Sequence, residues 1–240
     1  MSNFLGIIPA RSGSKRIINK NRVKIGNKEL IRFTFEAAEN SDLLFKCVLT
    51  SNDAEIIEIS KEYSKIETPF VRPEEISGDN STTVEVIDHV LEWYKYNEKY
   101  EPKNIILLQP TSPFRNSEDI NRAINQYEEN NLDSLISVCK PWNHPSECFI
   151  VKEGKLKLLT TNKNDENGRQ SYSDSFFIDG GIYICSLERY FKMKNLFDQN
   201  SSFIEMDQIH AIDIDTEFDL ELARAVYSNF NTNNKQDNPI

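Results

Sequence analysis

Cysteine and histidine are scarce in this chain of 240 residues. The four cysteines, Cys47, Cys139, Cys148 and Cys185, form no Cys-x-x-Cys pair, and three of them lie in apolar runs typical of buried free thiols. The three histidines lack the spacing of metal ligands. We therefore expect neither a disulfide nor a zinc site.

Long apolar runs and an excess of positive charge are also missing. No segment reaches the length of a membrane span, and the first residues lack the apolar region of a signal peptide. The formal net charge is −10 and the pI is about 4.9, which argues against nucleic acid or an anionic membrane as the main partner. These absences predict a cytoplasmic protein with no nucleic-acid partner and no membrane partner.

The common glycine-rich phosphate loops are absent as well. The sequence contains no Gly-x-x-x-x-Gly-Lys-Ser/Thr pattern and no Gly-x-Gly-x-x-Gly pattern. A P-loop nucleoside triphosphatase and a standard dinucleotide-binding domain are both disfavoured.

A basic stretch near the amino terminus is the strongest signal that is present. Residues 4–8 are apolar, Pro9 breaks the run, and residues 11–24 hold six Lys or Arg and no acid. Six neighbouring cations repel one another unless an anion lies between them, and the small residues 12–14 allow backbone N–H groups to face phosphate oxygens. The stretch predicts a phosphate-binding loop at the end of a buried strand. A solvated basic loop is the alternative.

Strand and helix patterns alternate along residues 4–138. The predicted strands are residues 4–8, 46–50, 68–71, 105–108 and 134–138, and the predicted helices are residues 29–40, 53–63, 84–96 and 118–129. This alternation predicts a three-layer α/β fold, with a mainly parallel sheet and helices on both faces. Ligands of such sheets bind beyond the carboxyl ends of the strands, where the basic loop and residues 109–113 lie. We expect one domain over residues 1–230 and a disordered polar tail over residues 231–240.

The alternation stops between residues 140 and 175. Segments 148–151 and 155–159 flank Lys-Glu-Gly, which predicts a small β-hairpin insertion that acts as a lid or a dimer contact. A further strand is predicted over residues 176–185, and the paired glycines inside it indicate a bulge or a close approach by a ligand.

An acidic segment balances the basic loop. Residues 205–221 hold seven Asp or Glu and no Lys or Arg, and the alternation of residues 211–214 predicts a strand that directs Asp213 and Asp215 to one face. Two such carboxylates repel each other unless a cation or a proton lies between them, and Mg²⁺ is commonly held by one or two carboxylates with phosphates and water. We therefore expect a magnesium site, with solvated aspartates as the alternative. Together the two charged segments suggest nucleotidyl transfer, in which an oxygen attacks the α-phosphorus of a nucleoside triphosphate and pyrophosphate leaves.

Seven short motifs follow one another along most of the chain. They are Ile-Pro-Ala-Arg-Ser-Gly-Ser-Lys-Arg at 8–16, Asn-Lys-Asn at 19–21, Arg-Pro at 72–73, Gln-Pro-Thr-Ser-Pro-Phe-Arg at 109–115, Arg-Gln at 169–170, Gly-Gly-Ile-Tyr-Ile at 180–184 and Asp-Ile-Asp-Thr-Glu-Phe-Asp at 213–219. In this order they resemble the acylneuraminate cytidylyltransferases, also called CMP-sialic acid synthetases. The resemblance implies a fold like that of nucleotide-diphospho-sugar transferases. It also implies Mg²⁺-dependent transfer of CMP from CTP to the anomeric hydroxyl of a nonulosonic acid, and a homodimer whose insertion packs over the partner's active site.

The resemblance also implies roles for individual residues. The residues expected to bind the nucleotide are Ala10, Arg11, Ser14, Lys15, Asn21, Arg72 and Thr83. The expected catalytic residues are Arg11, Lys15 and Lys20, and the expected metal ligands are Asp213 and Asp215. Arg169 is expected to hold the carboxylate of the acceptor sugar with a bidentate guanidinium, and the residues implied around it are Gln109, Gln170 and Tyr183.

Four positions depart from the family pattern, namely Ser12, Ile18, Glu147 and Asp179. The last two add negative charge near the sugar pocket, so legionaminic and pseudaminic acids stay open beside N-acetylneuraminate, and Kdo ranks below them. Two other functions also stay open: a related nucleotidyltransferase acting on Kdo or a sugar phosphate, and a catalytically silent nucleotide-binding protein.

Overall fold

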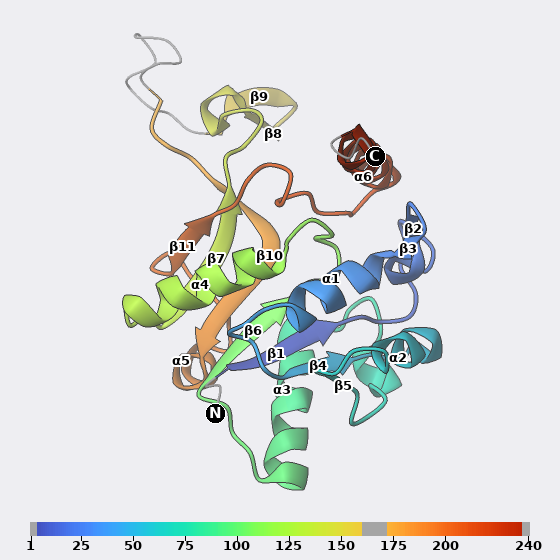
Figure 1. Cartoon of the computed structure of the whole chain (residues 1–240). Helices are drawn as coiled ribbons and strands as arrows, with labels where there is room; N and C mark the ends of the chain where they lie inside the picture. The colour runs from blue at the N-terminus through green and yellow to red at the C-terminus, as the bar shows by residue number, and fades with distance from the viewer. Residues whose placement is uncertain (1–3, 160–171, 237–240) are drawn as a thin grey trace.

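A seven-stranded sheet forms the centre of the computed structural model, which describes residues 4–159 and 172–236 (Figure 1). Its strands are β1 (Phe4–Pro9), β4 (Cys47–Thr50), β5 (Ile66–Glu67), β6 (Asn104–Leu108), β7 (Ser134–Cys139), β10 (Phe177–Ser186) and β11 (Ser202–Glu205). They lie in the order β11-β7-β10-β6-β1-β4-β5, and every neighbouring pair is parallel except the two pairs that β10 makes. The mainly parallel sheet expected from the sequence is confirmed.

The central strands are apolar along their whole length because both faces of the sheet are covered. Phe4, Leu5, Ile7 and Ile8 of β1 are all at most 2% exposed, as are the four apolar residues of β6. Continuous burial on two faces explains why these strands read as unbroken hydrophobic runs and not as alternating patterns.

Helices cover the two faces of the sheet. They are α1 (Leu30–Glu39), α2 (Ala54–Ser60), α3 (Thr83–Trp93), α4 (Ser117–Glu129) and α5 (Leu187–Met193). The last helix, α6 (Glu217–Gln236), packs in a separate apolar cluster that includes Ile25 and Leu30. Apolar residues of α1, α2 and α4 form one core against the sheet, and those of α3 and α5 form a second core with the opposite side chains of β1 and β6. The three-layer α/β fold is therefore confirmed. None of the helices in the two described segments has the length and apolar character needed to cross a bilayer.

Capping residues fix where the helices that border the site begin. Asp53 accepts hydrogen bonds from the first backbone N–H groups of α2, and Thr82 forms a capping box with Glu85 at the start of α3. Asn116 and Asp119 form the same motif at the start of α4. Each cap satisfies N–H groups that the helix itself leaves unpaired.

Two small antiparallel hairpins lie outside the main sheet. One is β2 (Lys24–Ile25) with β3 (Lys28–Glu29), and the other is β8 (Phe149–Lys152) with β9 (Lys155–Leu158). The second confirms the hairpin expected in the insertion, and Figure 1 shows it standing away from the sheet. Its apolar side chains are exposed, with Val151 at 74% and Leu156 at 69%.

Some predicted boundaries were wrong. The strand expected at residues 68–71 is β5 and lies at Ile66–Glu67, and α2 ends at Ser60 instead of residue 63. The tail expected to be disordered from residue 231 begins as a helix, because α6 continues to Gln236, and extending a formed helix costs far less than starting one.

Candidate functional site

The basic loop leaves β1 at the carboxyl edge of the sheet and is tied there to the end of β4. Ala10 donates its backbone N–H to the carbonyl of Thr50 at 3.0 Å, and Ser12 donates its N–H to Asn52 Oδ1 at 2.7 Å. Ala10 itself is fully buried. These two bonds fix the course of the loop on either side of Arg11, its first cation.

An aspartate holds the first pair of cations. Arg11 Nη2 lies 2.8 Å from Asp79 Oδ1, and Lys15 Nζ lies 2.8 Å from Asp79 Oδ2. The hydrogen bonds from Lys15 and from Arg11 lower the pKa of Asp79, so this carboxylate is ionised at neutral pH. Asp79 comes from the turn before α3 and was not among the site residues expected from the sequence.

A second aspartate holds the next pair. Lys20 Nζ lies 2.9 Å from Asp215 Oδ1 and also donates to the carbonyl of Ile214 at 2.9 Å. Arg16 Nη1 lies 3.5 Å from Asp215 Oδ2. The basic and acidic segments, expected to act together, are in direct contact.

A small apolar cluster explains this contact. Ile17 of the basic loop and Ile214 of the acidic segment are both buried, and they pack with Ile25, Leu220 and Ala223. The neighbouring Ile18 is 81% exposed. One buried isoleucine on each charged segment thus brings Lys20 and Asp215 together.

The last two cations of the stretch have structural partners. Arg22 Nε lies 3.2 Å from Asp53 Oδ2, and its guanidinium also pairs with Glu55. Lys24 Nζ lies 3.7 Å from Glu29. Both contacts anchor the loop to α2 and to the β2–β3 hairpin, so the cations that face the site are the first four.

The residues expected around the nucleoside lie beside the loop. Arg72 is 3% exposed and donates to the carbonyl of Thr50. Burial, and then the nearby charge of Arg11, lower its pKa to about 10. Asn21 Nδ2 donates to the carbonyl of Arg11 at 3.3 Å. Thr83 is exposed at the first residue of α3.

Gln109 and Tyr183 extend the site toward the middle of the sheet. Tyr183 lies on β10 opposite Leu107, after a bulge between Ile178 and Tyr183 that contains the two glycines. Burial raises the pKa of Tyr183 to about 12, helped by the charges of Asp179 and Asp213 and opposed by a hydrogen bond with Gln109. Gln109 and Tyr183, which are both expected to bind the acceptor sugar, therefore lie close to the acidic segment.

Arg115, which was not among the residues expected from the sequence, holds this region together. Arg115 is 1% exposed, and its Nη1 donates to the carbonyls of Gln109 at 3.2 Å and Gly181 at 3.0 Å. Its Nη2 donates to Thr34 Oγ1 at 2.8 Å. Burial lowers its pKa to about 10. An arginine in the Gln-Pro-Thr-Ser-Pro-Phe-Arg motif was visible, but its partners on α1 and β10 were not.

The strand predicted for residues 211–214 is absent, and the expectation that Asp213 and Asp215 share one face of a strand was wrong. The backbone N–H of Ile214 donates to the carbonyl of Thr111 at 2.8 Å, so the segment binds the Gln-Pro-Thr loop and joins no sheet ladder. Asp215 is exposed, and the hydrogen bond from Lys20 lowers its pKa.

Asp213 has the character expected of a cation ligand. Its Oδ1 is buried and has no hydrogen-bond partner. Burial raises the pKa of Asp213 to about 6, a side-chain hydrogen bond with Thr111 lowers it, and the charge of Asp215 adds to the increase. A buried carboxylate oxygen without a protein partner matches Mg²⁺, which takes most of its other ligands from phosphates and water. Within residues 4–159 and 172–236 no group of three or more His, Cys, Asp or Glu is placed to hold a metal ion.

Several expected residues lie elsewhere or outside the described part of the chain. Arg169 and Gln170 fall between residues 159 and 172 and are therefore outside the described residues. Ser14 is half-buried in the basic loop. His144 lines a cavity of about 320 Å³ together with Glu147 and stacks on Tyr172, with ring centroids 4.5 Å apart.

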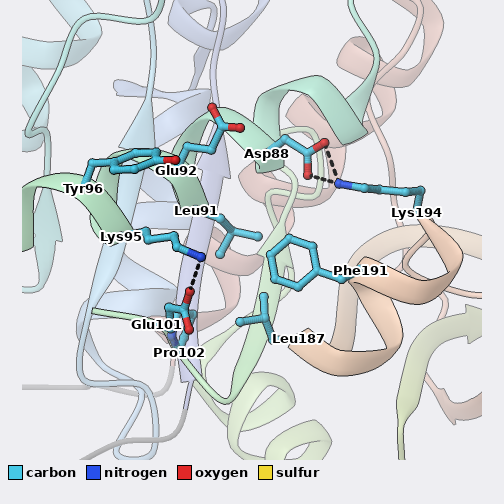
Figure 2. Close-up of a pocket in the computed structure, with 10 residues that line it drawn as sticks. All are labelled: Asp88, Leu91, Glu92, Lys95, Tyr96, Glu101, Pro102, Leu187, Phe191 and Lys194. Carbon is cyan, nitrogen blue, oxygen red and sulfur yellow. Dashed lines mark hydrogen bonds and ion pairs between the residues drawn. The ribbon is translucent and has the colours of Figure 1, made fainter. Parts of the chain in front are cut away.

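The cavity in Figure 2 is separate from these residues. It measures about 170 Å³ and lies between α3 and α5, over an apolar floor that includes Leu91 and Phe191. Ion pairs at its rim join Asp88 to Lys194 and Lys95 to Glu101. None of the expected site residues lines it, so the cavity is no part of the site.

Comparison with known proteins agrees with this geometry. The chain is 32% identical over 227 residues to the N-acylneuraminate cytidylyltransferase of Escherichia coli O18:K1:H7, covering 92% of this chain but only 51% of that protein. It is 29% identical to the pseudaminic acid cytidylyltransferase of Campylobacter jejuni serotype O:2, covering 93% and 95% of the two chains. A CMP-N,N'-diacetyllegionaminic acid synthase of Legionella pneumophila is 28% identical, with 91% and 94% covered.

Solved structures show the same fold at low sequence identity. A CMP:2-keto-3-deoxy-manno-octonic acid synthetase complexed with CTP superposes with a TM-score of 0.66 at 15% identity, covering 94% of this chain and 98% of the other. The fold class expected from the sequence is therefore confirmed. The sequence pattern of the cytidylyltransferase family matches residues 5–232, and this chain belongs to that family.

Proposed function

We propose that this chain transfers CMP from CTP to the anomeric hydroxyl of a nonulosonic acid of the sialic, legionaminic or pseudaminic type and releases pyrophosphate. The contact between Lys20 and Asp215 carries the proposal, because it joins a cationic phosphate-binding loop to a carboxylate pair at one edge of the sheet. The similarity to cytidylyltransferases for N-acylneuraminic, pseudaminic and legionaminic acids supports a nonulosonic acid as acceptor.

The chain's own residues would mainly bind and orient the reactants. Arg11, Ser14 and Lys15 would hold the triphosphate, and Lys20 would neutralise charge near the α-phosphorus. Nucleotidyl transfer requires little covalent chemistry from a protein, so positioned charge accounts for most of the rate increase. Arg72 and Asn21 are firmly held beside the loop and would contact the cytidine.

Asp213 and Asp215 would hold Mg²⁺, with the buried unpaired Oδ1 of Asp213 as the best-prepared ligand atom. The ion would supply further positive charge for the phosphate oxygens and acidify the attacking hydroxyl. Removal of divalent ions with EDTA should abolish turnover, and added Mg²⁺ should restore it. Undiminished turnover in EDTA would contradict this assignment.

The acceptor would lie between Gln109, Tyr183 and the cavity at His144. Arg169 would bind its carboxylate with two parallel hydrogen bonds, and Gln170 would lie beside it. Glu147 lines the His144 cavity, so an acidic residue borders the space assigned to the sugar. This added charge leaves legionaminic and pseudaminic acids open as acceptors beside N-acetylneuraminate.

The chain would act as a homodimer in the cytoplasm. The exposed apolar side chains of the β8–β9 hairpin include Val151 and Leu156, and burial against a second copy would remove them from water. The four cysteines are free, as expected in a reducing compartment. Sedimentation of the wild-type chain against a Val151→Asp, Leu156→Asp variant would test the dimer.

Pyrophosphate release is the direct test of the reaction. The chain would be incubated with CTP, Mg²⁺ and, in parallel, N-acetylneuraminate, di-N-acetyllegionaminate, pseudaminate and Kdo. We expect release with one of the first three sugars. Release with Kdo alone, or stronger turnover with UTP, GTP or ATP, would favour a related nucleotidyltransferase. Magnesium-dependent CTP binding without any release would favour a nucleotide-binding protein.

A further inference from the structure

The carboxylate of Asp79 occupies the position between two cations where a phosphate group is expected. Its two oxygens are divided between them, Oδ1 with Arg11 and Oδ2 with Lys15, each at 2.8 Å. One anion with its oxygens shared between two neighbouring cations is the arrangement of a bound phosphate. The proposed triphosphate site therefore already contains an anion that belongs to the chain.

The turn that carries Asp79 is held at both ends. Before it, Ser77 Oγ donates to the carbonyl of Pro73 at 2.8 Å, and after it the capping box of Thr82 and Glu85 starts α3. Between these anchors Ser81 donates its N–H to the carbonyl of Gly78 at 3.2 Å. Asp79 itself is exposed, so its side chain can turn away without unfolding a helix or strand.

Arg11 needs an anion because it lies beside another cation. Burial lowers the pKa of Arg72, and the nearby charge of Arg11 lowers it further, as expected for two cations close to each other. Asp79 offsets this repulsion and keeps Arg11 and Lys15 at the spacing of one bridging anion. Phosphates that bind between these two cations would displace the carboxylate, which would pair with them again once pyrophosphate has left.

We propose that Asp79 is a surrogate phosphate: it positions Arg11 and Lys15 in the free chain, competes with the triphosphate of the nucleotide, and helps to release pyrophosphate. The inference rests on the proposed function for the identity of the ligand. It assigns Asp79 a positioning role, with no bond made or broken on its carboxylate.

The test measures the affinity of the full-length chain for inorganic tripolyphosphate and pyrophosphate by calorimetry. Asp79→Asn should bind both probes about 3- to 10-fold more tightly than the wild type, the effect of losing two competing exposed ion pairs. Asp79→Glu, which keeps the charge, should bind nearly as weakly as the wild type. The difference between Asp79→Asn and the wild type should shrink at high salt, because the competing ion pairs are screened.

Glu75→Gln is the matched control. Glu75 is exposed on the 3-10 turn Glu74–Ile76, four residues before Asp79. Glu75→Gln changes the net charge of the chain by the same amount as Asp79→Asn. An equal gain in Glu75→Gln, or unchanged or weaker binding in Asp79→Asn, would overturn the proposal. So would a wild-type chain that binds neither probe.

Turnover of CTP is measured separately on the same variants. Tighter tripolyphosphate binding by Asp79→Asn supports the surrogate role even if no sugar is turned over. The absence of turnover would instead count against the proposed function. A lower KM for CTP in Asp79→Asn with stronger inhibition by pyrophosphate would support both. Thermal unfolding of each variant checks that the exposed substitution leaves the fold intact.

Discussion

Lys20 Nζ lies 2.9 Å from Asp215 Oδ1, although 195 residues separate the two in the sequence. This pair joins the loop proposed to bind phosphates to the segment proposed to bind Mg²⁺. Lys20→Ala should lower kcat by about 10²- to 10³-fold, the cost of removing one group aimed at developing charge. Steady-state pyrophosphate release measures this loss.

Lys24→Ala is the control for that experiment, because Lys24 belongs to the same basic stretch but pairs with Glu29 of the β2–β3 hairpin. Its activity should stay close to wild type. Full turnover by Lys20→Ala, or an equal loss in both variants, would show that Lys20 has no special role.

Arg115 should be important for stability. It is fully buried and supplies donors to Gln109, Gly181 and Thr34. Arg115→Met removes these buried hydrogen bonds, and we expect a loss of about 3 kcal/mol in the free energy of unfolding by urea. Arg122→Met removes an exposed arginine from its pair with Asp119 and should cost less than about 1 kcal/mol. Similar values for the two variants would contradict the assigned role.

Gly6 is required by the close packing of β1 against β4. A Cβ added at Gly6 would lie 2.3 Å from the sulfur of Cys47, far inside contact distance. Gly6→Ala should destabilise the fold by about 1–3 kcal/mol through overpacking. Cys47→Ala removes the sulfur, so the double variant should recover part of the loss. A double-mutant cycle with purely additive effects would refute this explanation.

His210 and Asp119 should make stability depend on pH. His210 Nδ1 lies 2.8 Å from Asp119 Oδ2, and the hydrogen bond that His210 donates to Asp119 raises the pKa of His210 above its usual 6.5. Burial opposes ionisation of Asp119, but hydrogen bonds from His210 and from the backbone of Asn116 outweigh it and lower that pKa below 3.8.

The contribution of His210 is complete below pH 6.5 and is lost as the pH rises through its folded pKa. The contribution of Asp119 is complete above pH 3.8 and is lost as the pH falls through its folded pKa. His210→Gln should therefore lower the free energy of unfolding by about 1 kcal/mol between pH 3.8 and pH 6.5, and by little at pH 9. Urea unfolding of His210→Gln and of the wild type at pH 6 and pH 9 measures this loss. An equal loss of stability at the two pH values would rule out the ion pair.

The strands that sequence analysis located best are the ones with the simplest pattern. β1, β4, β6 and β7 are short apolar runs, and burial on both faces leaves a clear signal. β11 was missed because Ser-Phe-Ile-Glu is short and half polar. The antiparallel direction of β10 was also missed, since strand direction depends on the connections that precede and follow a strand.

Some residues of the candidate site were predicted from the sequence and others were not. The two charged segments were predicted because each is a dense cluster of like charge, and the family resemblance implied roles for Lys20 and Asp215 within them. Asp79 and Arg115 were not predicted, because their roles depend on partners distant in sequence, such as Thr34, which is 81 residues from Arg115. The strand predicted at residues 211–214 is absent. The alternating pattern did not reveal that the backbone N–H of Ile214 donates to the carbonyl of Thr111.

The packing of Ile214 against Ile17 also has a consequence for synthesis on the ribosome. At about 5–20 residues per second, Lys20 is made roughly 10–40 s before Asp215. β1, β4, β5 and β6 can pair in that interval, since all four are complete by residue 108. The metal-binding half of the proposed site is absent until the segment before α6 docks, so a nascent chain can fold most of its sheet well before it can turn over substrate.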